Sequence, residues 1–240
     1  MPRKIFIVAH RGSSTKAPEN TLPAFEQAIK DGADFVETDV YRTRDGAIVC
    51  IHDPSLERTT NGEGYVLEKT IDYIRSLDAG SWFSERFKGV QVPLLEEYLD
   101  IIASSNAGAF IDIKMPGIEE RIIGKVLQWG LEDRTVILSG NWNVLLNVKR
   151  LVPSIPTLAS LAYMRKPNKQ AILSAAKVAD IVSIHRLFFE EQLSEIAHRK
   201  GLLVNVWDIN TPEEALRAVE NGADFITTDN PELIRKTIGK

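Results

Sequence analysis

The 240 residues suffice for one barrel domain or two small domains, and the 44% share of hydrophobic residues is that of an ordinary globular protein. The formal net charge of -4 excludes the basic surface typical of nucleic-acid binding, and the single cysteine, Cys50, excludes an intramolecular disulfide or a Cys-rich zinc site. The N-terminus lacks the apolar core of a secretory signal, and no apolar run is long enough to span a membrane. We therefore expect a cytoplasmic protein with no nucleic-acid partner and no stable membrane association.

Eight short apolar, β-branched segments recur along the chain, and such runs suit parallel strands that are covered on both faces. The predicted strands are Ile5–Ala9, Phe35–Val40, Ala109–Ile113, Thr135–Leu138, Thr157–Leu161, Ile181–Ile184, Leu202–Val206 and Phe225–Thr228. Amphipathic segments between them predict helices, among them Leu22–Lys30, Leu95–Ala103, Ile118–Trp129, Phe189–Arg199 and Pro212–Glu220. Thr211-Pro212 and Asn230-Pro231 each combine a capping residue with a proline, which favours a helix start.

This alternation favours an α/β fold, the (β/α)8 TIM barrel, as a single domain over residues 1–240. An open doubly wound sheet is the alternative. The segment 28–39 resembles 218–229, as expected when similar units close into a ring. Residues 54–92 interrupt the rhythm after the second strand, and we expect this insertion to cap the C-terminal face of the barrel as a lid or a substrate-selecting element.

Acidic residues occur at the ends of two neighbouring predicted strands. Glu37 and Asp39 are two positions apart in the second strand, so both point to the same side. Asp112 lies at the end of the third strand. Three carboxylates at the barrel mouth predict a site for one divalent cation, Mg2+ or Ca2+, with Mn2+ also acceptable. The alternative interpretation is that they form ion pairs with Arg11 and Lys114.

Two histidines are expected near these carboxylates. Asp45-Gly46 predicts a tight two-residue hairpin turn, and that turn would place His52 opposite Asp39 and on the same face. His10 follows the first strand, which neighbours the second in a barrel. Each histidine alone is most simply explained as a hydrogen-bonded structural residue, but together at a carboxylate cluster they form a candidate acid–base pair.

Fixed positive charge is expected at the same mouth. Arg11 can bind a phosphate in bidentate fashion, and Lys114 can neutralise another oxygen. Trp207 ends the seventh strand and either provides an apolar wall for a small alcohol or packs inside the barrel. Ser139 and His185 also end strands and are interpreted as pocket lining. The set of a cation, two histidines and two basic residues predicts phosphoryl chemistry on an anionic substrate.

Ten segments in chain order make the sequence resemble the glycerophosphodiester phosphodiesterase family, of the cytosolic bacterial and archaeal type, over nearly its whole length. They are His10-Arg11-Gly12, Pro18-Glu19-Asn20-Thr21, Glu37-Thr38-Asp39-Val40, His52-Asp53-Pro54, Arg58-Thr59-Thr60-Asn61-Gly62, Gly80-Ser81-Trp82-Phe83, Pro93-Leu94-Leu95-Glu96-Glu97, Asp112-Ile113-Lys114, Trp207 and Thr228-Asp229-Asn230-Pro231.

The resemblance implies metal-dependent hydrolysis of a small glycerophosphodiester to an alcohol and sn-glycerol 3-phosphate. It implies that His10 and His52 are the acid–base pair, that Arg11 and Lys114 hold the phosphate, and that a cyclic phosphate forms and is then opened by water. It also implies that Glu37, Asp39 and Asp112 are the metal ligands. Most relatives have Glu where this chain has Asp112, which shortens that ligand by one methylene group.

Three alternatives remain open on the sequence. Asp at position 112 resembles the arrangement in sphingomyelinase D-like relatives, so a lysophospholipase D or sphingomyelinase D-like phosphodiesterase is one of them. A Schiff-base mechanism at Lys114 would keep the barrel but need no metal. A non-enzymatic barrel that only binds a phosphoester is the third.

Overall fold

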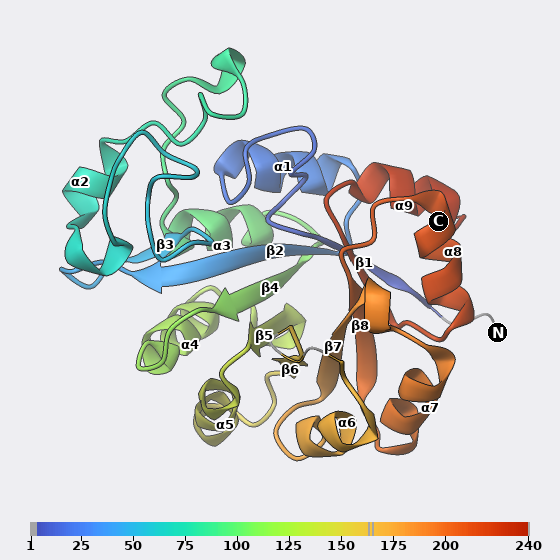
Figure 1. The fold of residues 1–240 in the computed structure, drawn as a ribbon. Coiled ribbons are helices and arrows are strands. Elements are labelled where there is room, and N and C mark those ends of the chain that lie inside the picture. The colour runs from blue at the N-terminus through green and yellow to red at the C-terminus, as the bar shows by residue number, and fades with distance from the viewer. Residues whose placement is uncertain (1–3, 163, 165, 240) are drawn as a thin grey trace.

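The computed structural model describes residues 4–162, 164 and 166–239, and its centre is a closed ring of eight parallel strands (Figure 1). β1 pairs with both β2 and β9, which closes the ring. The barrel prediction is therefore confirmed, and the open sheet is wrong. The ring strands are β1 (Phe6–Ala9), β2 (Phe35–Arg42), β4 (Gly108–Ile113), β5 (Thr135–Ser139), β6 (Thr157–Ser160), β7 (Ile181–His185), β8 (Leu203–Trp207) and β9 (Phe225–Thr228).

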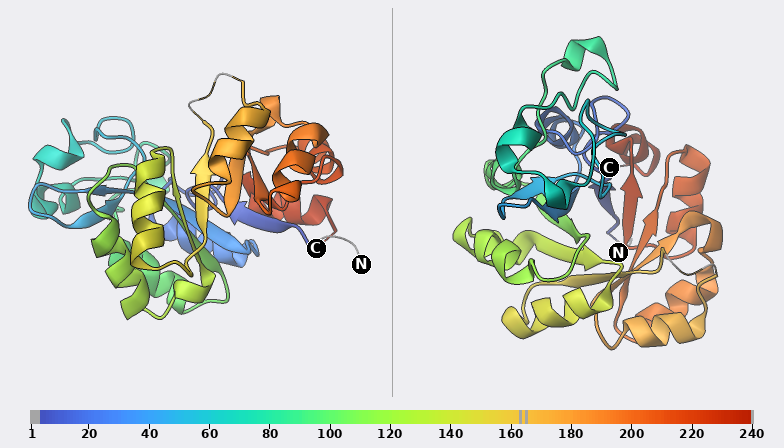
Figure 2. Two further views of the ribbon diagram at one scale, coloured as in Figure 1. Left: turned by 90° about the horizontal axis from the view of Figure 1, so that it is seen from below. Right: turned by 60° about the vertical axis from the view of Figure 1, so that its left-hand side comes forward.

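Helices pack around the outside of the ring, as Figures 1 and 2 show from three directions. They are α1 (Leu22–Lys30), α3 (Leu95–Ala103), α4 (Glu119–Gln128), α5 (Trp142–Leu151), α6 (Lys169–Ala175), α7 (Glu191–Arg199), α8 (Pro212–Glu220) and α9 (Pro231–Thr237). Thr211 and Asn230 cap α8 and α9 through their side-chain oxygens, as predicted. No helix among the described residues has the length and apolar character needed to cross a bilayer.

The inward-facing positions of the strands change from apolar to polar along the barrel axis. On β2 the alternation places Phe35, Glu37 and Asp39 on one face, and on β4 it places Phe110 and Asp112 on one face. Phe35 and Phe110 pack edge to face at 5.0 Å as part of an apolar cluster that also includes Phe225. Aromatic packing therefore fills one end of the barrel, and charged groups are left at the other.

The hairpin between β2 and β3 (Ile48–Cys50) has a different register from the predicted one. Arg42 pairs with Ile48, and the backbone of Thr43 bonds to Ala47, so the loop contains three residues rather than two. Gly46 takes a positive φ of 96°, which lets this longer loop close. As a consequence Asp39 lies opposite Ile51, whose N–H it accepts, and the predicted pairing of Asp39 with His52 is wrong by one residue.

Residues 54–92 form a separate lobe that lies beside β2, β3 and α3 (Figure 1). The lobe contains one short helix, α2 (Ile71–Arg75), and two 3-10 turns, Val66–Glu68 and Glu85–Phe87; other 3-10 turns are Glu132–Arg134 and Arg186–Phe188. Leu56, Val66 and Ile74 are fully buried in an apolar cluster with Val49 of the hairpin. The insertion therefore has its own small core, which packs against the β2–β3 hairpin.

Candidate active site

A cavity of about 550 Å³ opens among side chains at the carboxyl ends of the barrel strands. The acidic, basic and histidine side chains that line it all lie between His10 and Lys114, the residue that follows β4. The strands β5 to β9 and the segments after them contribute hydroxyl, amide and apolar groups. The lining includes each of the eight residues predicted from the sequence as catalytic, metal-binding or substrate-binding: His10, Arg11, Glu37, Asp39, His52, Asp112, Lys114 and Trp207.

Three carboxylates meet at the wall made by β2 and β4. Asp39 and Asp112 are Cα partners in the parallel pairing of these strands, and Glu37 lies one inward position before Asp39. One oxygen from each carboxylate lies within 4.8 Å of the others, with Glu37 and Asp39 buried and Asp112 half-buried. The predicted acidic cluster is therefore present.

Basic groups contact the same carboxylates. Lys114 Nζ lies 2.7 Å from Asp39 Oδ1 and also binds Asp112, and Arg11 Nε lies 3.4 Å from Asp39 Oδ2. Burial opposes ionisation of Asp39, but Lys114 and Arg11 outweigh it and hold the pKa of this carboxyl far below its usual value. The pKa of Lys114 is raised in turn by Asp39 and Asp112 against the effect of burial, so its amine stays protonated, which does not suit a Schiff-base nucleophile.

The acidic cluster fits a hard divalent cation. Among the described residues that line the cavity, the three carboxylates face two side chains with fixed positive charge, Arg11 and Lys114, so the carboxylates outnumber the fixed positive charges by one. Burial, followed by the nearby charge of Asp39, raises the pKa of Glu37 well above its usual range. A cation among these oxygens would favour the ionised form of Glu37, and an all-oxygen donor set is the one that Mg2+ and Ca2+ prefer. The cluster could therefore hold a metal ion.

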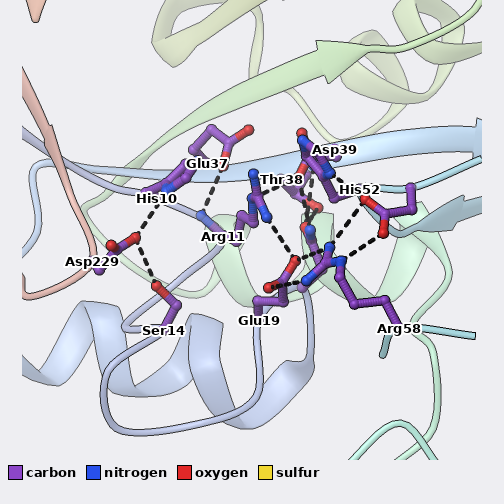
Figure 3. Close-up of polar contacts among 12 residues, drawn as sticks. His10, Arg11, Ser14, Glu19, Glu37, Thr38, Asp39, His52, Arg58 and Asp229 are labelled. Atoms are coloured by element: carbon purple, nitrogen blue, oxygen red, sulfur yellow. Dashed lines mark hydrogen bonds and ion pairs between the residues drawn. The ribbon is translucent and has the colours of Figure 1, made fainter. Parts of the chain in front are cut away.

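His10 is held by an aspartate that directly follows the last barrel strand, β9. Its Nδ1 lies 2.8 Å from Asp229 Oδ1 (Figure 3). Asp229 is fixed by Ser14 Oγ, which donates to Oδ1 at 3.0 Å, and by Asn210 Nδ2, which donates to Oδ2 at 2.6 Å. Burial would lower the pKa of His10, but the hydrogen bond to Asp229 and the nearby charges of Glu37 and Asp229 together outweigh it, and the pKa lies above its usual value.

His52 is held by its neighbour in the chain. Its Nδ1 lies 2.6 Å from Asp53 Oδ1, and Asp53 is bound in turn by Arg58 (Figure 3). Burial lowers the pKa of His52 below its usual value, opposed by Asp39 and aided by the positive charges of Arg11 and Lys114. The two histidines therefore line one cavity with pKa values displaced in opposite directions.

Arg11 lies in a turn that the sequence His10-Arg11-Gly12 makes possible. Arg11 and Gly12 have φ values of 56° and 84°, and a Cβ on Gly12 would come within 2.6 Å of the backbone of Ala24 in α1. This turn allows the N–H of Arg11 to donate to Glu37 Oε2 at 2.7 Å, while its guanidinium donates to Glu19 at 2.8 Å. Arg11 is thus bound to carboxylates through both its backbone and its side chain.

Other predicted lining residues have different surroundings. Trp207 lines the cavity, and its ring contacts His185 edge to face at 4.9 Å. Ser139 also lines the cavity, and it donates to the carbonyl of Ile113 at 2.8 Å. His185 itself is not among the lining residues; it accepts from the N–H of Leu187 and packs against Trp207, so its interpretation as pocket lining is wrong.

Several residues around the site were not assigned from the sequence. Asn20 donates to Asp39 Oδ2 at 2.8 Å and accepts from Thr38 Oγ1 at 2.8 Å. Glu19 and Asp229 were part of the quoted motifs but carried no predicted role. Only their presence in motifs shared with the family could have marked them as site residues, because sequence spacing does not show that residues 10 and 229 lie close together.

The fold and the site define a class of (β/α)8 barrel proteins in which an acidic cluster and two histidines line one cavity at the carboxyl ends of the strands. A sequence model of the glycerophosphoryl diester phosphodiesterase family matches residues 10–233. A glycerophosphodiester phosphodiesterase of Caldanaerobacter subterraneus subsp. tengcongensis is 36% identical, with 99% of each chain covered, and one of Bacillus subtilis is 32% identical over 98% of this chain and 87% of that protein. The chain belongs to the glycerophosphoryl diester phosphodiesterase family.

Solved structures support the same assignment. The crystal structure of a glycerophosphodiester phosphodiesterase from Agrobacterium tumefaciens superposes with a TM-score of 0.85 at 31% identity, covering 97% of this chain and 99% of that one. A phosphodiesterase from Oleispira antarctica, in complex with the product sn-glycerol-3-phosphate, gives a TM-score of 0.88 at 29% identity, covering 98% and 97%. The resemblance seen in the sequence motifs is confirmed.

Proposed function

We propose that this protein hydrolyses glycerophosphodiesters to an alcohol and sn-glycerol 3-phosphate. The observation that carries the proposal is a single cavity in which the acidic cluster and both aspartate-bound histidines meet. Family membership supports the same reaction, as does the product complex of the Oleispira antarctica phosphodiesterase. A small anionic diester fits the volume of the cavity, about 550 Å³.

Glu37, Asp39 and Asp112 are proposed to hold one divalent cation, Mg2+ or Ca2+, with Mn2+ also acceptable. When bound, such a cation withdraws charge from phosphate oxygens and stabilises the charge that develops during attack. The support is the number and burial of the carboxylates and the shortage of basic partners on the wall that they share.

His52 is proposed as the general base. A carboxylate at Nδ1 favours the tautomer that carries its proton on Nδ1, which leaves Nε2 with a lone pair to accept a proton from the attacking glycerol 2-hydroxyl. The cyclic phosphate that this step forms is then opened by water, with the two histidines exchanging their acid and base roles. The lowered pKa of His52 keeps this lone pair available near neutral pH.

His10 is proposed as the general acid that protonates the leaving alcohol. The carboxylate of Asp229 stabilises the imidazolium form, and the raised pKa of His10 keeps it protonated near neutral pH. Two groups whose pKa values are displaced in opposite directions are suited to opposite proton-transfer roles.

Arg11 and Lys114 are proposed to bind the phosphate, and Trp207 to contact the alcohol. Both basic groups line the cavity beside the acidic cluster, so a phosphate entering there would exchange part of their carboxylate contacts for its own oxygens. We further propose one domain over residues 1–240, with the insertion 54–92 placed at the cavity mouth to influence which substrates enter. None of residues 54–92 lines the cavity itself, so that influence would be exerted at its rim.

The purified chain should release sn-glycerol 3-phosphate from glycerophosphocholine in the presence of Mg2+ or Ca2+, detected with a coupled glycerol 3-phosphate dehydrogenase. A matched reaction with His52→Ala controls for contaminating phosphodiesterases, because that variant should turn over roughly 10²- to 10⁴-fold more slowly. Absence of turnover on glycerophosphodiesters carrying choline, ethanolamine, glycerol and inositol would refute the proposed function.

A further inference from the structure

Arg58, in the insertion, binds two carboxylates at once through one guanidinium group. Its Nε and Nη2 contact Asp53 at 2.5 and 3.1 Å. Its Nη1 and Nη2 contact Glu19 at 2.8 Å each. Figure 3 shows the guanidinium of Arg58 beside the carboxylate of Glu19, which comes from a distant segment of the chain. A planar group with several fixed donors is suited to such a double bidentate contact, and a lysine is not.

Each of these carboxylates also holds a side chain of the proposed site. Asp53 Oδ1 lies 2.6 Å from Nδ1 of His52, and Glu19 Oε1 accepts from Nη1 of Arg11 at 2.8 Å. A continuous series of charged hydrogen bonds therefore runs from His52 through Arg58 to Arg11. Arg11 in turn lies 3.4 Å from Asp39 in the acidic cluster.

The segment that carries Arg58 is fixed by packing rather than by Arg58 itself. Leu56 is fully buried in the apolar cluster of the insertion, and Thr60 returns two hydrogen bonds to the carbonyl of Leu56, one from its N–H and one from its hydroxyl at 2.7 Å. The side chain of Arg58 is 43% exposed, so its ion pairs contribute little to the free energy of folding. Its geometry is thus better explained by an effect on the residues that it orients.

We propose that Arg58 is a positioning residue, which fixes the imidazole of His52 and the guanidinium of Arg11 relative to each other and so connects the insertion to the catalytic cavity. Arg58 does not line the cavity and acts only through Asp53 and Glu19. The inference rests on the proposed function, because His52 and Arg11 have their roles only in that reaction.

Steady-state kinetics on glycerophosphocholine would compare Arg58→Gln with Arg58→Lys and Arg75→Gln. Arg75→Gln is the matched control, because Arg75 pairs with Glu97 at 2.6 Å and so ties the same insertion to α3 without contacting the site. Arg58→Gln should lower kcat by roughly 10- to 100-fold, as loss of a residue that orients an active-site group typically does, and should raise KM through Arg11. Arg58→Lys should recover part of kcat, and Arg75→Gln should leave kcat and KM unchanged.

A double-mutant comparison separates positioning from a general structural effect. If Arg58 acts through His52, Arg58→Gln should reduce kcat much less in a His52→Ala background than in the wild type. A structural effect would give the same fold-loss in both backgrounds and would overturn the proposal, as would an Arg58→Gln enzyme with wild-type kcat and KM. A wild-type enzyme without turnover would instead refute the proposed function, which keeps the two failures distinct.

Nitrogen-15 NMR of the imidazoles gives a readout that does not depend on turnover. The chain contains four histidines, and the His52 signals can be assigned by their loss in His52→Ala. In the wild type the signals of His52 should be those of a neutral imidazole with a protonated Nδ1 and an unprotonated Nε2. In Arg58→Gln the Nδ1 and Nε2 shifts of His52 should move toward each other as the two tautomers mix. Unchanged His52 shifts in Arg58→Gln would overturn the proposal.

Discussion

Asp39 and Asp112 are Cα partners in the parallel pairing of β2 with β4, so two carboxylates from adjacent strands point into the cavity at the same height. Lys114 binds both of them, and Glu37 completes the cluster from one inward position lower on β2. Burying this much negative charge is costly unless a cation accompanies it. This relationship underlies the proposed metal site and the predictions for it.

Asp112→Asn should weaken divalent-cation binding while keeping the size of the side chain. Loss of a partner that only orients a metal ligand costs about 10- to 100-fold, so loss of a ligand charge should reduce kcat/KM by at least roughly 100-fold. Asp112→Glu keeps a carboxylate at this position and should retain most of the activity, with a changed preference among Mg2+, Ca2+ and Mn2+. Both effects are measured by titrating each metal into metal-free enzyme and assaying turnover. Wild-type metal dependence in Asp112→Asn would remove this residue from the proposed ligand set.

His10→Ala and His52→Ala should each reduce kcat by roughly 10²- to 10⁴-fold, the usual contribution of an acid or base. The two losses should respond differently to the leaving group. A glycerophosphodiester of 4-nitrophenol needs no protonation of its leaving group, so it should restore much of the rate in His10→Ala but not in His52→Ala. Equal behaviour of the two variants on this substrate would contradict the assignment of acid and base.

The pH profile of kcat/KM should be bell-shaped around the ordinary histidine pKa of 6.5. His52 must be neutral, and because its pKa is lowered, activity should fall on the acidic side below 6.5. His10 must be protonated, and because its pKa is raised, activity should fall on the alkaline side above 6.5. Asp229→Asn removes the carboxylate that raises the pKa of His10, so the alkaline limb should move to lower pH while the acidic limb stays in place. If the alkaline limb of the profile did not move in Asp229→Asn, the loss of activity at high pH would not be due to His10.

Asn20→Ala should destabilise the fold as well as the site. Asn20 is buried, has a φ of 54°, and satisfies Asp39 Oδ2, the N–H of Asp39 and the hydroxyl of Thr38. Removing its amide leaves buried polar groups unpaired, at a cost of about 1–3 kcal/mol in the free energy of unfolding. Asn143→Ala, at an exposed position of α5, is the control and should change stability by less than about 0.5 kcal/mol. Urea denaturation of the two variants measures both values, and equal stabilities would contradict the role given to Asn20.

The barrel and its mouth were predictable because they follow from local patterns. Apolar runs such as Phe225–Thr228 marked the strands to within two residues, and the spacing of Glu37 and Asp39 placed both on one face. The hairpin register was not predictable in this way, because a three-residue loop and a two-residue loop differ only in how the backbone around Gly46 closes. His52 nevertheless lines the cavity. It lies two residues beyond the end of β3, so its side-chain direction is not set by the alternation of side chains between the two faces of a strand.

Contacts between distant segments were the part that the sequence could not supply. The Nε2 of His198, on α7, lies 3.0 Å from Asp224, and the side chain is only 28% exposed, although neither fact follows from the spacing of the two residues. Likewise nothing in the spacing of His10 and Asp229 shows that they are 2.8 Å apart, because ring closure between β1 and β9 brings them together. Such partners depend on tertiary packing, and so do the pKa values of the histidines.

A crystal of the protein grown with Mn2+, measured at a wavelength where manganese scatters anomalously, tests the central claim most directly. We expect one anomalous peak bonded to oxygens of Glu37, Asp39 and Asp112, with His10 and His52 on either side of it. Crystals of Asp39→Asn grown in the same way should lack the peak. Activity that persists in excess EDTA, together with no manganese peak among these carboxylates in the wild type, would contradict the account.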